Sequence, residues 1–170
     1  MYVILIMKMQ NKITIYTDGA ASGNPGPAGW GAVVIFNDQL KVKSEKLKII
    51  ELGGKSDHAT NNQMELTAPI EVLKYLKKEK IAGKIEIVSD SKYVILGITE
   101  WIFNWHKNNW RNAAKKPVMN RELWEELFIL TQELKPKWFY VAGHGENKYN
   151  QRADEIAVSF SYGQPVELRN

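Results

Sequence analysis

The sequence predicts one α/β domain in which helices flank a mixed β-sheet, and three observations support this fold class. The chain has 170 residues, of which 44% are apolar and 25% charged, so it can bury a core. Its strand-like and helix-like runs follow the order β-β-β-α-β-α-α-β-α. Neither a repeat nor a linker divides it. We therefore predict a single domain over residues 1–170, with its core at about 11–162, an N-terminal extension at 1–10 and a C-terminal tail at 161–170.

The first two elements are predicted to form a hairpin whose first strand ends at an acid. Residues 13–17 are rich in β-branched and aromatic side chains, and Asp18 follows them. Residues 19–29 are rich in glycine and proline, which predicts a wide loop before a second strand at 30–36. Because Asp-Gly pairs are common in turns, Asp18 is either a turn former or a functional carboxylate at a strand end.

A third strand is predicted at residues 39–50, which alternate lysine with apolar side chains. This pattern is typical of a strand with one face in water and a protected edge. The residues that follow, 51–60, contain Gly53 and Gly54 and are predicted to form a loop.

The longest helical pattern covers residues 61–80 and carries an acid one turn from its start. Its apolar side chains recur every three or four residues, and Thr60 or Asn61 can cap its first turn. Pro69 lies inside the pattern, and its ring should crowd the carbonyl group of Glu65, four residues earlier. We therefore expect a bend or an irregular first turn near Glu65.

The next strand also ends at an acid. Residues 84–88 form a short β run before Asp90, and a helix is predicted at 91–97, capped by Asp90 or Ser91. The remaining elements are predicted as a helix at 121–134, a strand at 137–141 and a helix at about 150–160.

Two features of the composition limit the class of protein. Without cysteine the chain has no disulfide framework and no cysteine-based zinc site, which suits a reducing compartment. Residues 1–10 are apolar but lack the basic region and cleavage site of a signal peptide, and they are too few to span a membrane. We interpret them as an extension of the first strand, or as sequence upstream of a start at Met7 or Met9. We expect a cytoplasmic protein with no membrane partner.

The net charge of +4 is concentrated in one stretch, residues 101–120, which contains four cations and no acid. Outside this stretch the chain has 19 basic and 19 acidic residues. The stretch also carries three of the six tryptophans. A solvated face is the ordinary interpretation of such cations, but the missing acids favour a polyanionic partner. The four cations are Lys107, Arg111, Lys115 and Lys116.

Four acids lie at or near the ends of regular elements, where side chains from different elements can converge: Asp18, Glu65, Asp90 and Asp154. Asp90 could instead be a helix cap, Glu65 a charge that favours a helix start, and Asp154 a solvated helical acid. In a shared cleft their repulsion would require cations, and oxygen-only ligands select Mg²⁺ or Mn²⁺. Two such ions about 3.5–4 Å apart would suit in-line attack on a phosphodiester.

Four motifs, in this order, resemble the bacterial-type (type 1) ribonuclease H family: YTDGA with GNPGPAGWG, TNNQMEL, SDSKYV and GHGENKYNQRADEIA. The resemblance covers about residues 13–160. The spacing from Asp90 to Asp154, through the basic stretch, is similar to that of the family's long form with a basic protrusion. The resemblance implies a ribonuclease H-like fold, with a five-stranded mixed sheet whose first three strands are antiparallel and with helices on both faces.

The resemblance also implies a metal-dependent endoribonuclease that cuts the RNA strand of RNA–DNA hybrids, without sequence preference, to 5′-phosphate and 3′-hydroxyl ends. Asp18 would bridge two Mg²⁺ ions, with Mn²⁺ as a substitute. Asp154 would complete the site of the ion that activates water, and Glu65 with Asp90 would hold the ion that stabilises the leaving 3′-oxygen. His144, on a glycine-flanked loop, would shuttle a proton or assist product release, which suits its pKa range.

Two sets of nucleic-acid contacts follow from the same resemblance. The positions that match contacts to the RNA strand, which its 2′-OH groups distinguish from DNA, are Asn24, Asn61 and Glu65. The positions that match contacts to the DNA strand are Thr60 and Asn62 around one phosphate, and Trp101, Lys107, Trp110, Arg111, Lys115 and Lys116 in the basic stretch. The cations would lie on phosphates and at least one tryptophan on a sugar face. Trp105 and Trp124 are predicted to pack in the core instead.

The chain departs from the family pattern at its ends and at residues 53–59, which look longer than usual. The N-terminal extension lacks the basic aromatic composition of the family's hybrid-binding domain. Two other classes stay open: a non-catalytic hybrid-binding module, and a two-metal nuclease of transposase-like or resolvase-like type that acts on DNA. The four intact acids argue against the first, and Asn24 and Asn61 argue against the second. We expect a monomer.

Overall fold

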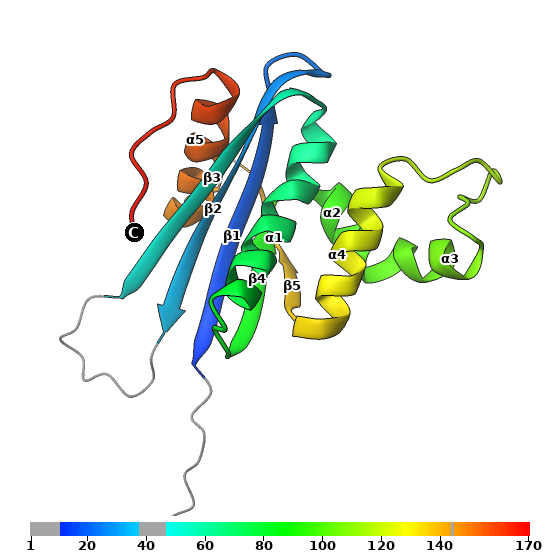
Figure 1. The fold of residues 1–170 in the computed structure, drawn as a ribbon, viewed down its shortest axis with the longest axis horizontal. Coiled ribbons are helices and arrows are strands. Elements are labelled where there is room, and N and C mark those ends of the chain that lie inside the picture. The colour runs from blue at the N-terminus through cyan, green and yellow to red at the C-terminus, as the bar shows by residue number, and fades with distance from the viewer. Residues whose placement is uncertain (1–10, 38–46, 144) are drawn as a thin grey trace, which may run out of the picture.

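The core of the fold is a five-stranded sheet with the strand order β3-β2-β1-β4-β5 (Figure 1). The strands are β1 (Lys12–Ala21), β2 (Gly26–Asn37), β3 (Lys48–Ala59), β4 (Lys84–Ser89) and β5 (Lys137–Tyr140). The first three pair antiparallel, while β4 is parallel to β1 and β5 is parallel to β4. The coordinates are a computed structural model that describes residues 11–37, 47–143 and 145–170. The predicted α/β class with a mixed sheet is confirmed.

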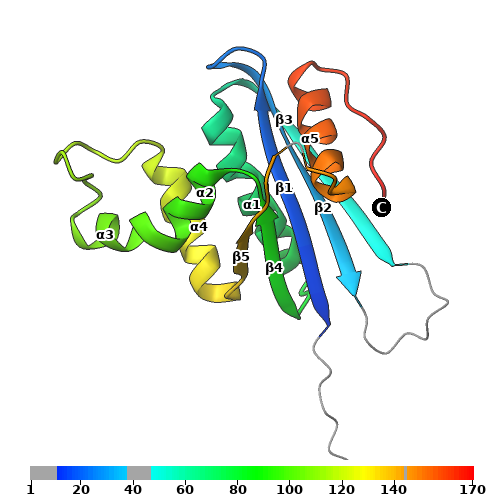
Figure 2. The same ribbon diagram turned by 180° about the vertical axis from the view of Figure 1, so that it is seen from behind.

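Helices cover both faces of this sheet, as the resemblance implied. They are α1 (Asn61–Lys78), α2 (Lys92–Leu96), α3 (Ile102–Lys107), α4 (Arg121–Leu134) and α5 (Lys148–Ser161), with a π-helical turn, η1 (Gly97–Trp101), between α2 and α3. Figures 1 and 2 show α1 and α4 on one face and α5 on the other, while α3 lies away from the sheet. The main core lies under α1 and α4. A smaller group under α5, here named the α5-face cluster, consists of Val33, Ile35, Ala153 and Ile156.

The first hairpin differs from the prediction because its strands continue through the glycines. β1 runs three residues past Asp18, and β2 begins at Gly26, so the loop is much shorter than residues 19–29. Gly19 and Gly29 lie within strands because helices pack directly on them. A Cβ atom at Gly29 would lie 2.4 Å from the carbonyl oxygen of Ala157 in α5. The prediction that Asp18 ends its strand was therefore wrong.

The predicted loop at 51–60 is also wrong, because β3 continues to Ala59. Gly53 and Gly54 leave space that large side chains fill, and they do not form a turn. A Cβ atom would meet the Phe160 ring at Gly53, and the Trp30 indole at Gly54. Of the strand predicted at 39–50, residues 39–46 lie outside the described residues, as does the N-terminal extension at 1–10.

The helix that carries Glu65 is continuous and begins regularly. Thr60 is its N-cap: its side chain accepts a hydrogen bond from the backbone N–H of Gln63, while the Gln63 side chain accepts from that of Thr60. Pro69 is buried within the helix and does not end it. The irregular first turn expected from Pro69 is therefore not found.

The helix predicted at 91–97 begins at the predicted place but does not stop. The Ser91 side chain caps α2, and the chain stays helical through Gly97 and η1 into α3. A Cβ atom at Gly97 would lie 2.0 Å from the Trp124 ring. Gly97 therefore allows the helix to pack closely against Trp124. It does not end the helix, as the sequence had suggested.

Candidate active site

Asp18 and Asp90 lie next to each other at the carboxyl end of the parallel strand pair. β1 and β4 pair up to Thr17 and Ser89, the residues that precede the two acids. Asp18 thus stands at the carboxyl end of the parallel ladder, although β1 itself continues in its antiparallel pairing with β2. In open α/β sheets this end of the strands is where ligands collect.

Glu65 reaches this place because α1 touches the sheet at Gly19. A Cβ atom at Gly19 would lie 2.3 Å from the backbone nitrogen of Glu65, which only a residue without a side chain allows. Gly19 follows Asp18 directly, so the contact brings Glu65 next to the first acid.

Asp154 reaches the same place from the opposite face. Gly31 is the cross-strand partner of Asp18 in β2, and a Cβ atom there would lie 2.3 Å from the carbonyl oxygen of Ala153 in α5. Asp154 is the next residue. The two glycines beside Asp18, one next to it along the strand and one across the ladder, therefore bring both helices to it.

The electrostatics of Asp18 show that the four acids share one site. The pKa of Asp18 is raised from 3.8 to about 8, mainly by burial and further by the charges of Asp90, Asp154 and Glu65, while a hydrogen bond from the Gly19 backbone N–H opposes the rise. None of the four acids forms an ion pair with a lysine or arginine in the described ranges. Asp18, Glu65 and Asp90 are half-buried and Asp154 is exposed. The site is therefore a concentration of negative charge that no described lysine or arginine neutralises.

Hydrogen bonds hold two of these acids, and sequence reasoning missed two of the donors. The Ser91 hydroxyl and the Asn61 side-chain amide donate to the Glu65 carboxylate, the latter over 2.8 Å. Burial and the charge of Asp90 raise the pKa of Glu65, which these two hydrogen bonds partly offset. Ser91 had been assigned only a capping role, and it performs both.

Asn150 is the second missed donor. Its side-chain amide donates to Asp90 Oδ2 over 3.1 Å, and its own Oδ1 atom is buried with no hydrogen-bond partner among the described residues. It lies in the first turn of α5, four residues before Asp154. Because this helix was predicted to start at about residue 150, the contact of Asn150 with Asp90 was not foreseen: a polar residue at a helix start usually serves as a cap. The cap is in fact Asn147.

The four carboxylates suit divalent cations by their chemistry but are not yet arranged around one. All donors are oxygens, as Mg²⁺ and Mn²⁺ prefer, and their uncompensated charge would be relieved by a cation. In the described part of the chain, however, no three acidic or histidine side chains are grouped so that they could hold an ion as they stand. Glu65 is turned towards Ser91 and Asn61, and Asp90 towards Asn150. Ion binding would require these side chains to reorient.

The three residues predicted for the RNA strand are joined in one chain of hydrogen bonds. Asn24 Oδ1 accepts from the backbone N–H of Asn61 over 3.1 Å, and the Asn61 side chain donates to Glu65. Asn24 lies in the loop between β1 and β2, so the loop, the start of α1 and the carboxylate site are connected. Beside them, Asn62 is exposed and Thr60 is used as the helix cap.

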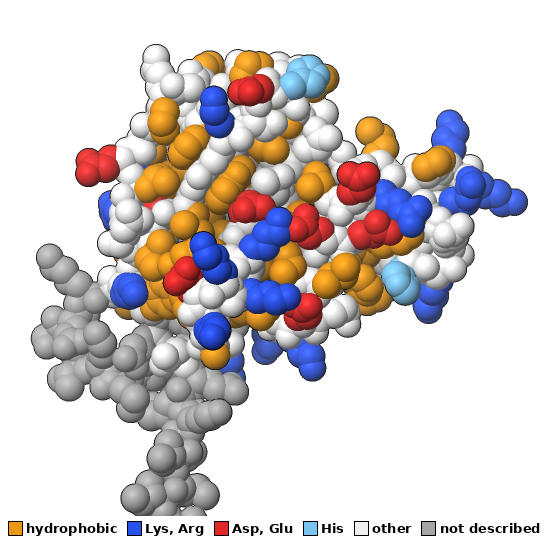
Figure 3. Space-filling view, viewed as in Figure 1, with side chains coloured by type: hydrophobic (Ala, Val, Ile, Leu, Met, Phe, Trp, Pro, Cys, Tyr) orange, Lys and Arg blue, Asp and Glu red, His pale blue; other side chains and the backbone are white. Residues whose placement is uncertain are grey.

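The basic stretch forms a lobe beyond the sheet, here named the basic protrusion (residues 101–120). Figure 3 shows blue Lys and Arg side chains at the tip of this lobe. Its four cations are exposed, and none forms an ion pair with a described residue. The loop after α3 is closed by a bridge between Arg111 and Pro117, and the Arg111 guanidinium donates to the Lys115 carbonyl oxygen over 2.8 Å.

The tryptophans of this region have different surroundings. Trp124 is fully buried and Trp105 packs against the main core, as predicted. Trp110, which was predicted to contact the DNA strand, is only 7% exposed and packs near the Arg121 guanidinium. Trp101 is 37% exposed and lines a shallow groove with Arg111. Among the predicted aromatic contacts, Trp101 is therefore the accessible one.

The position of His144 lies outside the described residues. Its neighbour Gly143 is close to the site, since a Cβ atom there would lie 3.1 Å from Asp90 Oδ2. The carbonyl oxygen of Gly145 accepts a hydrogen bond from the Gln151 side chain in α5.

The mixed sheet, the helix on each face and the acids between them define a protein with the ribonuclease H-like fold. The family profile described as RNase H matches residues 10–161, and the chain belongs to this family. A curated relative, the ribonuclease H of Thermosynechococcus vestitus, is 47% identical over 155 residues, covering 91% of this chain and 92% of the relative. The described helices include none that is long and apolar enough to cross a bilayer.

Solved structures agree on the fold. The crystal structure of LC9-RNase H1, a type 1 RNase H with the type 2 active-site motif, is similar with a TM-score of 0.83 at 23% identity, covering 95% of this chain and 78% of that one. LC11-RNase H1, solved in complex with an RNA/DNA hybrid, has a TM-score of 0.57 at 26% identity, with 86% and 94% of the chains covered.

Proposed function

We propose that this chain hydrolyses the RNA strand of RNA–DNA hybrids as an endoribonuclease. The observation that carries the proposal is the site around Asp18, where two helices meet the sheet at glycines and add their acids to those of the strands. Relatives at 45–48% identity are named ribonuclease H, which supports the same activity. The likeness to LC11-RNase H1 supports a hybrid as the substrate.

The proposed cofactor is a pair of Mg²⁺ ions, for which Mn²⁺ can substitute, held by Asp18, Glu65, Asp90 and Asp154. When bound, such ions supply an activated water for attack and offset the charge that develops on the leaving 3′-oxygen. Asp18, which lies between the other acids, is the residue suited to contact both ions. Asp154 belongs to the water side of the site, and Glu65 with Asp90 to the leaving-group side. The products are a 5′-phosphate and a 3′-hydroxyl.

The chain's own residues would prepare this site by holding its acids and by admitting only the correct strand. Ser91 and Asn150 hold Glu65 and Asp90 beside Asp18 in the absence of an ion, and the two acids would exchange these hydrogen bonds for metal contacts when they reorient. Asn24 and Asn61, joined by a hydrogen bond, present amide groups next to Glu65, where the 2′-OH groups of an RNA strand would lie. A DNA strand lacks these hydroxyls, so these amides would lose partners.

The basic protrusion would hold the DNA strand of the hybrid. Its cations are exposed and form no ion pair with a described residue, so their charges are available to phosphates, and Trp101 offers an accessible ring for a sugar face. Thr60 and Asn62 would bind a further phosphate at the start of α1. Because these contacts carry no base information, we expect cleavage without sequence preference.

Other parts of the proposal rest on the sequence alone. His144 is assigned to proton transfer or product release. The protein is proposed to act in the cytoplasm and as a monomer.

The experiment that tests the proposal compares hybrid, double-stranded RNA and double-stranded DNA side by side, with Mg²⁺, with Mn²⁺ and with a chelator. We expect the hybrid alone to be cut, in its RNA strand, only with a divalent ion, and with 5′-phosphate ends. Cleavage of double-stranded DNA but not of hybrid would contradict the proposal and favour a DNA nuclease on the same scaffold.

A further inference from the structure

The predicted C-terminal tail begins one residue later than expected, because α5 ends at Ser161, and residues 162–170 are bound at the edge strand β3. The backbone N–H of Glu51 in β3 donates to the carbonyl oxygen of Arg169 over 2.7 Å. The backbone N–H of Arg169 in turn donates to the Glu51 carboxylate over 3.1 Å. Between these contacts and α5, Val166 and Leu168 pack against the α5-face cluster. The tail thus connects the edge of the sheet to the helix that carries Asp154.

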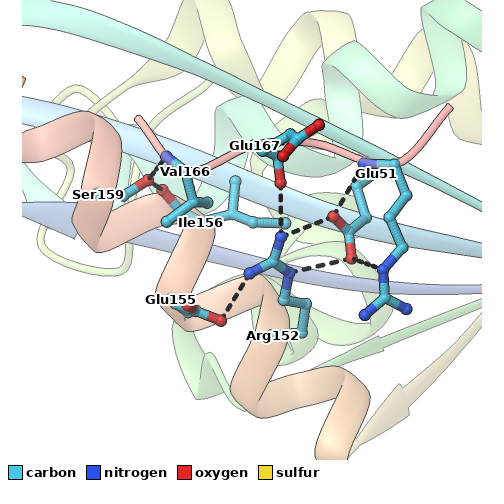
Figure 4. Close-up of polar contacts among 8 residues, drawn as sticks. Glu51, Arg152, Glu155, Ile156, Ser159, Val166 and Glu167 are labelled. Carbon is cyan, nitrogen blue, oxygen red and sulfur yellow. Dashed lines mark hydrogen bonds and ion pairs between the residues drawn. The ribbon is translucent and has the colours of Figure 1, made fainter. Parts of the chain in front are cut away.

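The centre of this connection is a buried carboxylate, drawn in Figure 4. The Glu51 side chain has no exposed surface, and the Arg152 guanidinium of α5 donates to both of its oxygens over 3.0 and 2.9 Å. Arg152 also donates to the carbonyl oxygen of Glu167 in the tail over 2.8 Å and to the exposed carboxylate of Glu155. Burial would raise the pKa of Glu51, but the hydrogen bonds from Arg152 and Arg169 lower it overall, so Glu51 is ionised.

Asp154 differs from the other three acids in how it is held. Each of those accepts a hydrogen bond from a neighbouring residue, whereas the Asp154 side chain has no hydrogen-bond or ion-pair partner within the described ranges. Its position depends entirely on α5. That helix is fixed beneath by the contact of Ala153 with Gly31 and at the side by the bonds of Arg152 to Glu51. These two contacts involve the two residues directly before Asp154.

We propose that Glu51 is a positioning residue for the metal site: through Arg152 and the tail it holds α5 where Asp154 can join the other acids. The inference rests on the proposed function, in which Asp154 binds a metal ion. Two parallel N–H···O bonds to a buried carboxylate fix both distance and rotation, which a purely apolar contact does not. Groups bonded directly to a metal ligand typically change metal affinity 10–100-fold when removed. Glu51 acts one step further away, through α5, so we expect an effect at the lower end of that range.

The test is Glu51→Gln, which keeps the shape of the side chain but removes its charge and one acceptor oxygen. Mg²⁺ binding is measured without substrate from the amide NMR shifts of Asp18 and Gly19, together with kcat and KM for hybrid. We expect the Mg²⁺ concentration for half-saturation to rise about tenfold, with kcat reduced at low Mg²⁺ and KM unchanged. Unchanged Mg²⁺ binding would overturn the inference.

A double variant, Glu51→Leu with Arg152→Met, separates positioning from stability. Replacing both members of a buried ion pair with apolar residues avoids the unpaired charge that a single substitution leaves. We expect the Tm to recover towards that of the unsubstituted protein while Mg²⁺ binding stays weak. If Mg²⁺ binding recovers together with the Tm, the pair is only structural and the inference fails.

Two controls distinguish this inference from the proposed function. Glu155→Gln removes another carboxylate bonded to Arg152, but an exposed one that touches neither sheet nor tail, and should leave Mg²⁺ binding unchanged. Asp154→Asn should weaken it. If Asp154→Asn has no effect, the metal role of Asp154 in the proposed function fails. If it weakens binding and Glu51→Gln does not, only the positioning role fails.

Discussion

The carboxylate site and the basic protrusion are opposite in charge and built in opposite ways. The acids of the site converge between the sheet and two helices, and three of them accept hydrogen bonds. Burial and the charges of the other acids raise the pKa of Asp18 to about 8. The cations of the protrusion are exposed on a lobe beyond the sheet and have no acidic partner among the described residues. The carboxylate site concentrates negative charge, which lowers the stability of the fold. The basic protrusion exposes its positive charges to water, which lowers the stability little.

This difference separates two tasks. Chemistry on a phosphodiester needs oxygens at fixed positions, which only the rigid sheet and its close helix contacts can provide. Binding a polyanion needs positive charge over a wide surface and tolerates mobile side chains. Substitutions in the site should therefore change kcat, and substitutions in the protrusion should change KM and its salt dependence. The predictions below test this division, beginning with the largest effect.

The largest effect is expected for Asp18→Asn. The amide removes one negative ligand from the centre of the site, so kcat should fall by at least about 10³-fold, with the fold intact. Steady-state kinetics with Mg²⁺ measures this loss. Near-normal turnover would contradict the bridging role of Asp18.

The same variant has an effect on stability that is measured without divalent ions. The pKa of Asp18 is raised from 3.8 to about 8, so the folded protein holds this proton more tightly than the unfolded chain does. The resulting stability is complete below about pH 4 and is lost as the pH rises through about 8. The Tm of Asp18→Asn should therefore equal that of the unsubstituted protein near pH 4 and exceed it increasingly towards pH 8. Asp57→Asn, at an exposed acid, should show no such trend.

A smaller loss is expected for Gly31→Ala, which tests whether the glycine contact positions Asp154. The new methyl group would lie 2.3 Å from the Ala153 carbonyl oxygen, so α5 must move away from the sheet. A shift of about 1 Å can cost about 10²-fold in rate, and overpacking costs about 1–3 kcal/mol in the free energy of unfolding. Both kcat and chemical denaturation should report it, with KM for hybrid little changed.

Gly53→Ala is the matched control. It also adds a methyl group under α5, but against side-chain atoms of Phe160 and Ile156 and not against the backbone of α5. Its effect on kcat should be several-fold smaller than that of Gly31→Ala. Equal losses of kcat would mean that the distance of the whole helix α5 from the sheet matters, and not the contact beside Asp154.

The same glycines mark how far the sequence could predict this fold. Alternating and helical apolar patterns were enough for the element order and for the first hairpin, whereas the antiparallel pairing of the first three strands came from the family resemblance. Gly19, Gly53 and Gly97 were each interpreted as a turn, loop or helix end, because a sequence shows a missing side chain but not the group that occupies its space. In the structure α1, Phe160 and Trp124 occupy those spaces.

The candidate site divides in a similar way. The four acids could be selected from their motifs, and the contact of Asn24 with Asn61 agrees with the shared role predicted for them. The roles of Asn150 and of the Glu51–Arg152 pair could not be predicted from the sequence. Each role depends on a contact between segments separated by 60 residues or more along the chain. The burial of Trp110 was hidden for a different reason: the aromatic and basic composition around it suits a nucleic-acid surface as well as a packed lobe.

The smallest effect on chemistry is expected where four charges are removed at once. Replacing Lys107, Arg111, Lys115 and Lys116 with Ala should raise KM for hybrid about fivefold or more at moderate salt and leave kcat within about twofold. Each phosphate contact contributes about 0.9 to the slope of log affinity against log salt for duplex DNA, so the slope should flatten by up to about 3.6 when all four cations contact phosphates. The measurement is KM at several salt concentrations.

The control for this variant removes four exposed lysines elsewhere, at Lys48, Lys78, Lys84 and Lys137. This control variant has the same net charge as the variant of the basic protrusion, so it should lower the long-range attraction of the hybrid equally. The slope of log affinity against log salt should stay nearly unchanged. If both variants flatten the slope alike, the hybrid responds to the net charge of the protein and not to the protrusion. A fall in kcat with unchanged KM would be more damaging, because the protrusion would then act on the chemistry and the two regions would not be separate.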